Sequence, residues 1–125
     1  MKYTGSTIAF TSLVLSCFTA KHFLTPLNDS NSLVVPTVTI YEVCKVILRE
    51  SSENDALQAA VAMQKGAVVD LTPSLAIAAS KLSLEHNLPM ADSVVLATAR
   101  EFNAILWTQD SDFKNINNVK YFPKK

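Results

Sequence analysis

Residues 89–113 read PMADSVVLATAREFNAILWTQDSDF, and this stretch predicts one helix followed by one strand. A proline suits the first position of a helix, because its missing N–H would have no partner there, so we expect the helix to begin at Pro89. Small and apolar side chains recur at helical spacing up to Phe102, which predicts one apolar face. Asn103 is typical of the left-handed residue that ends a helix. The run from Ala104 to Thr108 is short, mostly apolar and bounded by turn formers, as a buried strand would be.

Carboxylates stand at both ends of this helix–strand unit. Asp92 falls in the first turn of the predicted helix, where unpaired N–H groups stabilise a negative charge. Asp110 and Asp112 follow directly after the predicted strand. In open α/β sheets, ligands bind beyond the carboxyl ends of the strands. We therefore expect a functional site at this end of the unit.

Composition limits the possible classes of protein. A chain of 125 residues, 49% of them apolar, predicts a single folded domain over residues 1–125. Eleven basic and eleven acidic side chains cancel, so no strong overall field attracts nucleic acid or an anionic membrane. A polyanionic substrate would need local compensation, for which a divalent metal ion is the obvious candidate. Cys17 and Cys44 match no metal or redox spacing, and we interpret them as buried thiols of a cytoplasmic protein.

The N-terminal region allows two interpretations. Residues Ile8 to Ala20 are rich in apolar side chains behind a single Lys2, which superficially resembles a signal peptide. Hydroxyl residues interrupt this run, and it is shorter than the roughly 20 apolar residues that span a bilayer. We expect it to be a helix of the fold, with a cleaved signal as the alternative. Before it, Lys2 to Thr4 predicts a brief strand that ends at Gly5.

The rest of the chain alternates between strand and helix patterns. The predicted elements are a strand at Ser32–Val35 stopped by Pro36, a helix from about Thr39, a polar break at Ser51–Asp55, a helix closing at Gly66, a strand at Ala67–Leu71, a helix capped by Thr72 and begun by Pro73, and an edge strand at Val119–Phe122. Such alternation over one domain predicts an α/β sandwich built on a parallel sheet.

Four acids fall at predicted element ends, namely Glu42, Asp92, Asp110 and Asp112. If the strands that precede them are parallel and adjacent, all four carboxylates gather at one edge of the sheet. Crowded carboxylates repel one another unless a cation neutralises them. Ligand sets made of oxygen alone, without His or Cys, favour Mg²⁺ or Mn²⁺. Such an ion can activate water for attack on a phosphate.

Each acid also has a purely structural explanation. Thr39-Ile-Tyr-Glu42 matches a capping box, in which the Thr and the Glu satisfy the first N–H groups of a helix. Asp92 is favoured in a first turn by the helix dipole alone, and Asp110 and Asp112 can cap a turn. Taken singly, these explanations are preferred. We favour a shared site because independent caps have no reason to converge on one sheet edge.

Three motifs in order give the chain a resemblance to a known family. They are Val35-Pro-Thr-Val-Thr-Ile-Tyr-Glu42-Val43, then Pro89-Met-Ala-Asp92-Ser, then Leu106-Trp-Thr108-Gln-Asp110-Ser-Asp112-Phe113. Together they resemble the PIN domain, and most closely the small VapC-type toxins of prokaryotic toxin–antitoxin pairs.

The resemblance implies a three-layer α/β/α sandwich with a mainly parallel five-stranded sheet. It also implies a Mg²⁺- or Mn²⁺-dependent ribonuclease whose site an antitoxin blocks. Carried over by motif, Glu42, Asp92 and Asp110 would be the metal ligands. Asp112 would be an auxiliary acid, and the Thr108 hydroxyl would line the pocket.

The chain departs from the family at one position. The family begins with a strand that ends in Asp and is followed by two small hydroxyl residues. Here Ser6 and Thr7 match the hydroxyl pair, while Gly5 stands where the first acid is expected. Three carboxylates and the Ser6 hydroxyl can still hold an ion that keeps several waters.

Three functional hypotheses follow. The first is a cytoplasmic endoribonuclease toxin acting on single-stranded RNA, without contact to a membrane. The second is a PIN-fold binding module that has lost turnover but still binds an antitoxin or RNA. The third is a receiver-like or phosphatase-like α/β domain, which lacks support because no acidic pair follows the first strand. Apolar residues in the predicted helix near Ala56–Met63 would serve a homodimer or an antitoxin contact.

Overall fold

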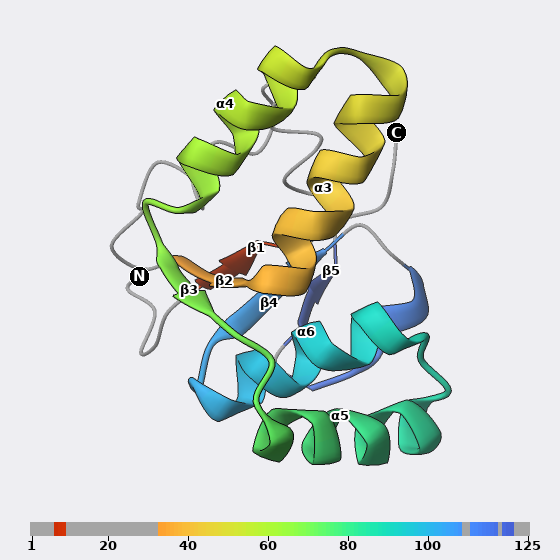
Figure 1. The fold of residues 1–125 in the computed structure, drawn as a ribbon. Helices are drawn as coiled ribbons and strands as arrows, with labels where there is room; N and C mark the ends of the chain where they lie inside the picture. Colours follow the sequence, from red (N-terminus) through yellow and green to blue (C-terminus); the bar gives the residue numbers. More distant parts are fainter. Residues whose placement is uncertain (1–6, 10–32, 109–110, 118, 122–125) are drawn as a thin grey trace.

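The computed structural model describes residues 7–9, 33–108, 111–117 and 119–121. Within them, strands and helices alternate along the chain (Figure 1). In chain order the elements are β1 (Thr7–Ala9), β2 (Leu33–Pro36), α3 (Thr37–Glu50), α4 (Glu53–Met63), β3 (Ala67–Val69), α5 (Pro73–His86), α6 (Met90–Glu101), β4 (Ile105–Thr108), the short 3₁₀ helix η2 (Ser111–Phe113) and β5 (Val119–Tyr121).

The five strands form one sheet in the order β3-β2-β1-β4-β5, and every neighbouring pair is parallel. The predicted α/β class with a parallel five-stranded sheet is confirmed. β5 lies at the edge of the sheet, as its lysine- and proline-rich surroundings predicted. From β1 the chain builds the sheet outward on one side with β2 and β3, then on the other side with β4 and β5. The strand order therefore reverses between β1 and β4.

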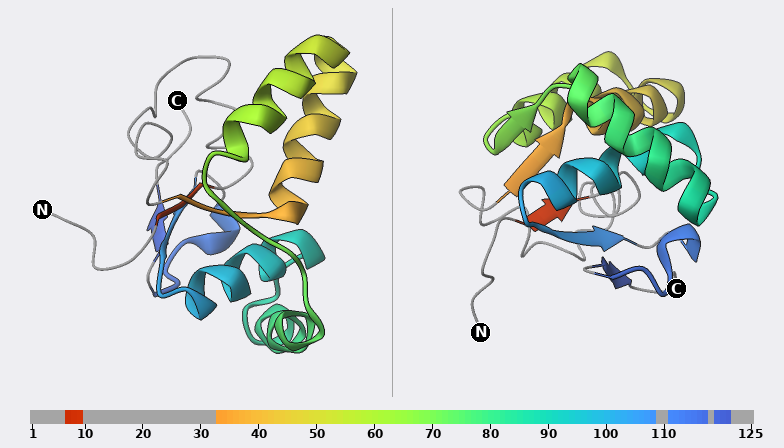
Figure 2. Two further views of the ribbon diagram at one scale, coloured as in Figure 1. Left: turned by 60° about the vertical axis from the view of Figure 1, so that its left-hand side comes forward. Right: turned by 90° about the horizontal axis from the view of Figure 1, so that it is seen from below.

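Strand β2 supplies side chains to two separate cores. Leu33 and Val35 pack in a cluster with buried residues of α3 and α4. Val34 packs instead with buried residues of α5 and α6. Because successive side chains of a strand point to opposite faces, this alternation places the two helix pairs on opposite faces of the sheet. Figure 1 shows α3 and α4 above the sheet and α5 and α6 below it, and Figure 2 shows the same three layers from two further directions.

Helix α6 differs from the prediction, which gave it one apolar face. Its residues from Asp92 to Ala99 are all buried, around the whole circumference of the helix. The reason is that α6 lies between the sheet and α5, and α5 covers the side that would otherwise meet solvent. Small side chains such as Ser93 and Thr98 fit this position, because Ser93 donates to the Met90 carbonyl and Thr98 to the Val94 carbonyl.

Several predicted helix ends are confirmed. The Ser52 hydroxyl accepts a hydrogen bond from the Asp55 N–H and caps α4. The Thr72 hydroxyl accepts one from the Leu75 N–H, and Pro73 follows at the first position of α5. Asn103 adopts a positive φ of 51° after α6, as expected. α6 itself begins at Met90, so Pro89 is its N-cap and not its first residue.

Two predictions near other element starts are wrong. α3 begins at Thr37 and not near Thr39, because Pro36 ends β2 and the helix follows without a connecting loop. Thr39 is therefore inside the helix, and the capping box is not formed. The strand Thr7–Ala9 occupies two positions that were predicted to begin a helix, and Thr7 opens a strand where it was expected to follow one. The predicted strand at Lys2–Thr4 lies outside the described residues.

Gly66 lies where the chain turns from α4 into β3. A Cβ atom at this position would lie 2.6 Å from the Leu33 carbonyl oxygen and 3.0 Å from the Leu33 Cβ. The turn can approach β2 this closely because glycine has no side chain. In the described part of the chain, no helix is both long enough and apolar enough to cross a membrane.

Candidate functional site

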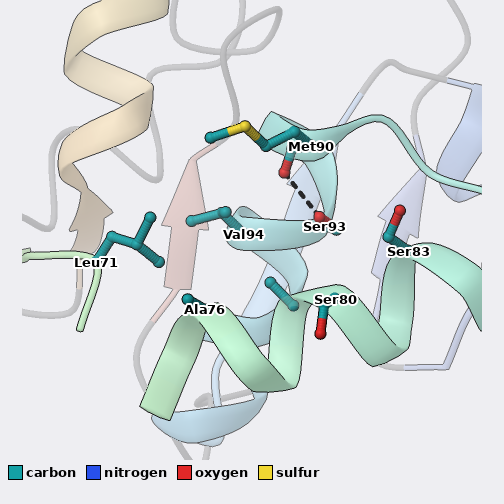
Figure 3. A pocket seen from close by; sticks show the side chains of 8 residues that line it. Leu71, Ala76, Ser80, Ser83, Met90, Ser93 and Val94 are labelled. Carbon is teal, nitrogen blue, oxygen red and sulfur yellow. Dashed lines mark hydrogen bonds between the residues drawn. The ribbon is translucent and has the colours of Figure 1, made fainter. Parts of the chain in front are cut away.

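The sheet topology selects one edge for ligand binding. In a parallel sheet whose strand order reverses, helices cover both faces, and a crevice remains outside the carboxyl ends of the strands at the reversal. Here that point lies between β1 and β4. Figure 3 shows the arrowheads of β1 and β2 directed towards the end of α6 that carries Met90. The starts of α3 and α6 therefore lie at the carboxyl edge of the sheet, and α3 contacts α6.

The strand register fixes the relative positions of the carboxyl ends of β2 and β4. Ile8 of β1 pairs with Val34 of β2 on one side and with Leu106 of β4 on the other. Pro36 and Thr108, each two residues further, therefore end their strands at the same level. With β1 between them, two strand spacings of about 4.8 Å separate these ends, roughly 10 Å in total.

Glu42 is the sixth residue of α3 and is half-buried. Its explanation as part of a capping box is excluded, since the helix begins two residues before Thr39. Glu42 therefore lies more than one turn inside a helix that starts at the carboxyl edge of β2. Its carboxylate interacts with neighbouring groups of the protein.

Asp92 lies in the first turn of α6 and is only 6% exposed. Burial of a carboxylate costs free energy unless polar groups or a cation compensate for lost hydration. The helix dipole supplies part of this compensation, and Asp92 also interacts with other groups of the protein. A buried carboxylate at the ligand-binding edge is stronger evidence for a site than an exposed one would be.

The other predicted site residues fall into two groups. Thr108 is fully buried at the carboxyl end of β4, and Asp112 is exposed in η2, close beyond that strand. Both make interactions within the protein. Asp110 and Ser6 lie outside the described residues, as does Gly5. The topology thus brings the starts of the helices that carry Glu42 and Asp92 to the edge of the sheet where β4 ends at Thr108, and Asp112 follows in η2.

These side chains offer oxygen donors only, which is the chemistry that Mg²⁺ and Mn²⁺ prefer. Across residues 7–9, 33–108, 111–117 and 119–121, no three Asp, Glu, His or Cys side chains are placed to hold a metal ion together. The predicted third ligand, Asp110, lies outside this set. The oxygen donors of Glu42, Asp92 and Thr108 are therefore of the type that a hard cation prefers.

Thr39 has an unexpected environment that the sequence did not reveal. Its side chain is fully buried in the first turn of α3, and its Oγ1 has no hydrogen-bond partner among the described residues. Thr98 in α6 is nearly as buried, but its Oγ1 donates to the Val94 carbonyl at 2.8 Å. The pattern Thr-x-x-Glu pointed to a helix cap and so concealed this residue.

A cleft of about 270 Å³ lies between α5 and α6 (Figure 3). Its walls are mainly apolar, and they include Leu71, Met90 and Val94. The hydroxyls in its lining donate to carbonyls of their own segment, as Ser83 does to Leu88. None of the described site residues named above lines this cleft, so the chemistry of the acids and not the cleft defines the candidate site.

Comparison with known proteins gives the family. The model of the PIN domain matches residues 11–119. The chain belongs to the PIN domain family. No curated protein sequence matches it.

Solved structures share the fold of this PIN domain. A toxin–antitoxin complex from Klebsiella pneumoniae is 21% identical, with a TM-score of 0.80 over 95% of this chain and 100% of that chain. DNA-bound VapBC from Salmonella typhimurium is 13% identical, with a TM-score of 0.77 over 96% and 98%. VapC20 from Mycobacterium tuberculosis, a toxin that cleaves the sarcin–ricin loop, is 16% identical, with a TM-score of 0.74 over 90% and 95%. At these identities the likeness establishes the VapC-like fold.

Proposed function

We propose that this PIN domain is a metal-dependent endoribonuclease that hydrolyses phosphodiester bonds of single-stranded RNA, and that it is the toxin of a toxin–antitoxin pair. The observation that carries the proposal is the position of Glu42 and buried Asp92. Their helices, α3 and α6, both start at the carboxyl edge of the sheet, where the strand order reverses and where the chain continues from β4 towards Asp110. The fold shared with VapC toxins supports the same activity.

Glu42, Asp92 and Asp110 would hold the Mg²⁺ or Mn²⁺ ion. When bound, such an ion polarises the phosphate and makes a water molecule more acidic. The protein supplies the positions: α3 fixes Glu42, and α6, which is buried from Asp92 to Ala99, fixes Asp92. Thr108 would line the pocket with its hydroxyl, and Asp112 would act as an auxiliary acid. Ser6 was predicted to add a hydroxyl, but it directly precedes β1, whose carboxyl end is at Ala9, so we no longer assign it to the site.

The first acid of the family needs a revised position. β1 ends at Ala9, so residue 5 precedes this strand and residue 10 follows it. The sequence after β1 reads Phe10-Thr11-Ser12, which also places two hydroxyl residues next to the position of the acid. We propose that Phe10, and not Gly5, occupies the first acid position. Under either alignment no carboxylate stands there, so activity rests on the remaining acids.

An antitoxin is the proposed protein partner. Structural neighbours are complexes of VapC-type toxins with their antitoxins, some of them bound to DNA. In this chain, Leu57 and Val61 of α4 are 59% and 62% exposed. These apolar side chains lie on the outer side of the α3–α4 pair, and they are the proposed contact for the antitoxin or for a second copy of the chain.

The test is cleavage of a 5′-labelled single-stranded RNA by the purified chain with Mn²⁺, Mg²⁺ or EDTA. We expect cleavage with Mn²⁺ or Mg²⁺ and intact RNA with EDTA. Cleavage that persists in EDTA would contradict the metal dependence. The missing first acid specifically favours one alternative, a binding module without turnover. That alternative predicts RNA binding with Mn²⁺ present but no product at any protein concentration.

A further inference from the structure

The four described α-helices begin in two different ways. α4 and α5 have the side-chain caps Ser52 and Thr72. α3 and α6 have Pro36 and Pro89 as their N-caps, and neither start has a side-chain cap hydrogen bond. A helix leaves its first N–H groups without an intrahelical partner, and a proline cap has no hydroxyl or carboxylate to accept from them. The two starts that lie at the candidate site are thus the two without a side-chain acceptor.

The start of α3 has a second feature that indicates a ligand. The Thr39 hydroxyl is fully buried and has no hydrogen-bond partner among the described residues. Side chains of a helix lean towards its N-terminus, so the side chain of its third residue lies beside the first turn. A helical Thr commonly donates to a carbonyl of the preceding turn, as Thr98 does in α6. Thr39 makes no such bond, so its buried O–H is a donor without a partner among the described residues.

We propose that the first turn of α3 binds a phosphate group of the RNA substrate. The main-chain N–H groups of Thr37, Val38 and Thr39 and the Thr39 hydroxyl would donate to the phosphate oxygens. Thr39 is then a substrate-binding residue and not a helix cap. This inference rests on the proposed function, because it assigns part of the same site.

The charges at this edge favour such a contact over binding of another group. The N-terminus of a helix carries the equivalent of about half a positive charge, and backbone N–H groups point at the ligand. Glu42 lies one turn further along α3, so a phosphate held at Thr39 would be next to an acid that needs a cation. The phosphate and the Glu42 carboxylate can share one divalent ion. A neutral carbonyl or a cationic amine at this position would be attracted less strongly by the helix start and by that ion.

The direct test is a titration of the ¹⁵N-labelled protein with inorganic phosphate in the presence of Mg²⁺, monitored by NMR. We expect saturable shifts of the amide signals of Thr37, Val38 and Thr39, and little change at the capped first turns of α4 and α5. Sulfate titrated in parallel should shift the same signals. Absence of saturable shifts at residues 37–39 would overturn the proposal, since the hydroxyl would then be satisfied by water alone.

The second test uses substitutions at Thr39 and a labelled single-stranded RNA 12-mer, with EDTA present to prevent cleavage. Thr39→Val keeps the side-chain volume and removes the donor. It should weaken RNA binding about tenfold, as expected for a lost hydrogen bond to a charged group. Thr39→Ser should restore most of the affinity. The matched control, Thr98→Val, removes a buried hydroxyl that already has a partner and should bind RNA like the unsubstituted chain.

The thermal stability of Thr39→Val separates a binding role from a structural one. Removing a buried hydroxyl without a partner should leave the unfolding temperature unchanged or raise it. A lowered unfolding temperature together with unchanged RNA affinity would overturn the proposal. If the protein cleaves RNA with Mn²⁺ and Thr39→Val binds RNA normally, the phosphate site fails while the proposed function stands. If phosphate shifts residues 37–39 but no variant or condition gives cleavage, the site stands and the ribonuclease proposal fails.

Discussion

The starts of α4 and α5 follow the local rules of helix formation, whereas the starts of α3 and α6 do not. Ser52 and Thr72 accept hydrogen bonds from the N–H groups of Asp55 and Leu75. Pro36 and Pro89 provide no such acceptor. The two helices without side-chain caps are the ones that carry Glu42 and Asp92, the acids of the candidate site. Helix starts without caps beside the proposed site agree with the general observation that functional sites depart from the local rules of stability.

The largest expected effect is the loss of catalysis on removing an acid beside an uncapped start. Asp92→Asn should lower Mn²⁺-dependent RNA cleavage by about a thousandfold, because it removes a proposed ligand of the ion that would polarise the reacting phosphate. Its thermal stability should be unchanged or higher, since a buried charge is removed. Cleavage and unfolding temperature are measured on the same preparation. Unchanged cleavage would identify a contaminating nuclease as the source of the activity.

A second prediction concerns the acid missing after β1. Phe10→Asp should raise Mn²⁺ affinity and cleavage by about tenfold, because it adds a fourth carboxylate at the strand end. Gly5→Asp is the matched control, since residue 5 precedes β1 and should leave both quantities unchanged. Manganese binding is measured by calorimetry and cleavage by gel. A gain with Gly5→Asp and none with Phe10→Asp would restore the alignment inferred from sequence alone.

Removing the caps of the other two helices should mainly affect stability. Ser52→Ala and Thr72→Ala should each lower the free energy of unfolding by about 1 kcal/mol, the usual contribution of an N-cap. RNA affinity and cleavage should change much less than in Asp92→Asn, because neither α4 nor α5 carries a proposed metal ligand. Urea unfolding and a binding titration check the two parts. Cleavage lowered in either variant as strongly as in Asp92→Asn would break the distinction between the two kinds of helix start.

The smallest expected effect comes from adding a cap where the protein lacks one. Pro89→Ser offers a hydroxyl to the first N–H groups of α6, which stabilises the folded state. Loss of the proline also makes the unfolded chain more flexible, which opposes this gain. The free energy of unfolding should therefore change by only about 0.5 kcal/mol. RNA cleavage should fall modestly, because the new hydroxyl competes with ligands for the same N–H groups. Pro73→Ser, at the capped start of α5, is the control and should leave cleavage unchanged.

Local signals in the sequence predicted a large part of this fold. Thr72 and Asn103 act through their immediate neighbours, so their roles were evident without tertiary information. The predicted polar break at Ser51–Asp55 contains Ser52, which the structure identifies as the cap of α4. The parallel sheet followed from the alternation of strand and helix patterns, and the PIN family followed from three ordered motifs.

The structural features that the sequence did not predict depend on contacts with residues distant in the chain. β1 is only three residues long and is a strand because β2 and β4 pair with it, so no local pattern located it. Thr39 and Glu42 matched a capping box, and only the position of Pro36 at the end of β2 shows that α3 begins earlier. The burial of α6 from Asp92 to Ala99 depends on its contact with α5. It was not predicted, because polar side chains such as Ser93 suggested an exposed face. The convergence of the acids was inferred from topology, and their role remains a proposal.

The alternating side chains of β2 have a consequence for how the molecule unfolds. Leu33 and Val35 belong to the core under α3 and α4, while Val34 belongs to the core under α5 and α6. Losing either core exposes apolar surface on the shared strand and weakens its support for the other. We therefore expect the two helical layers to melt in a single cooperative transition, with amide hydrogens of β2 among the slowest to exchange with solvent.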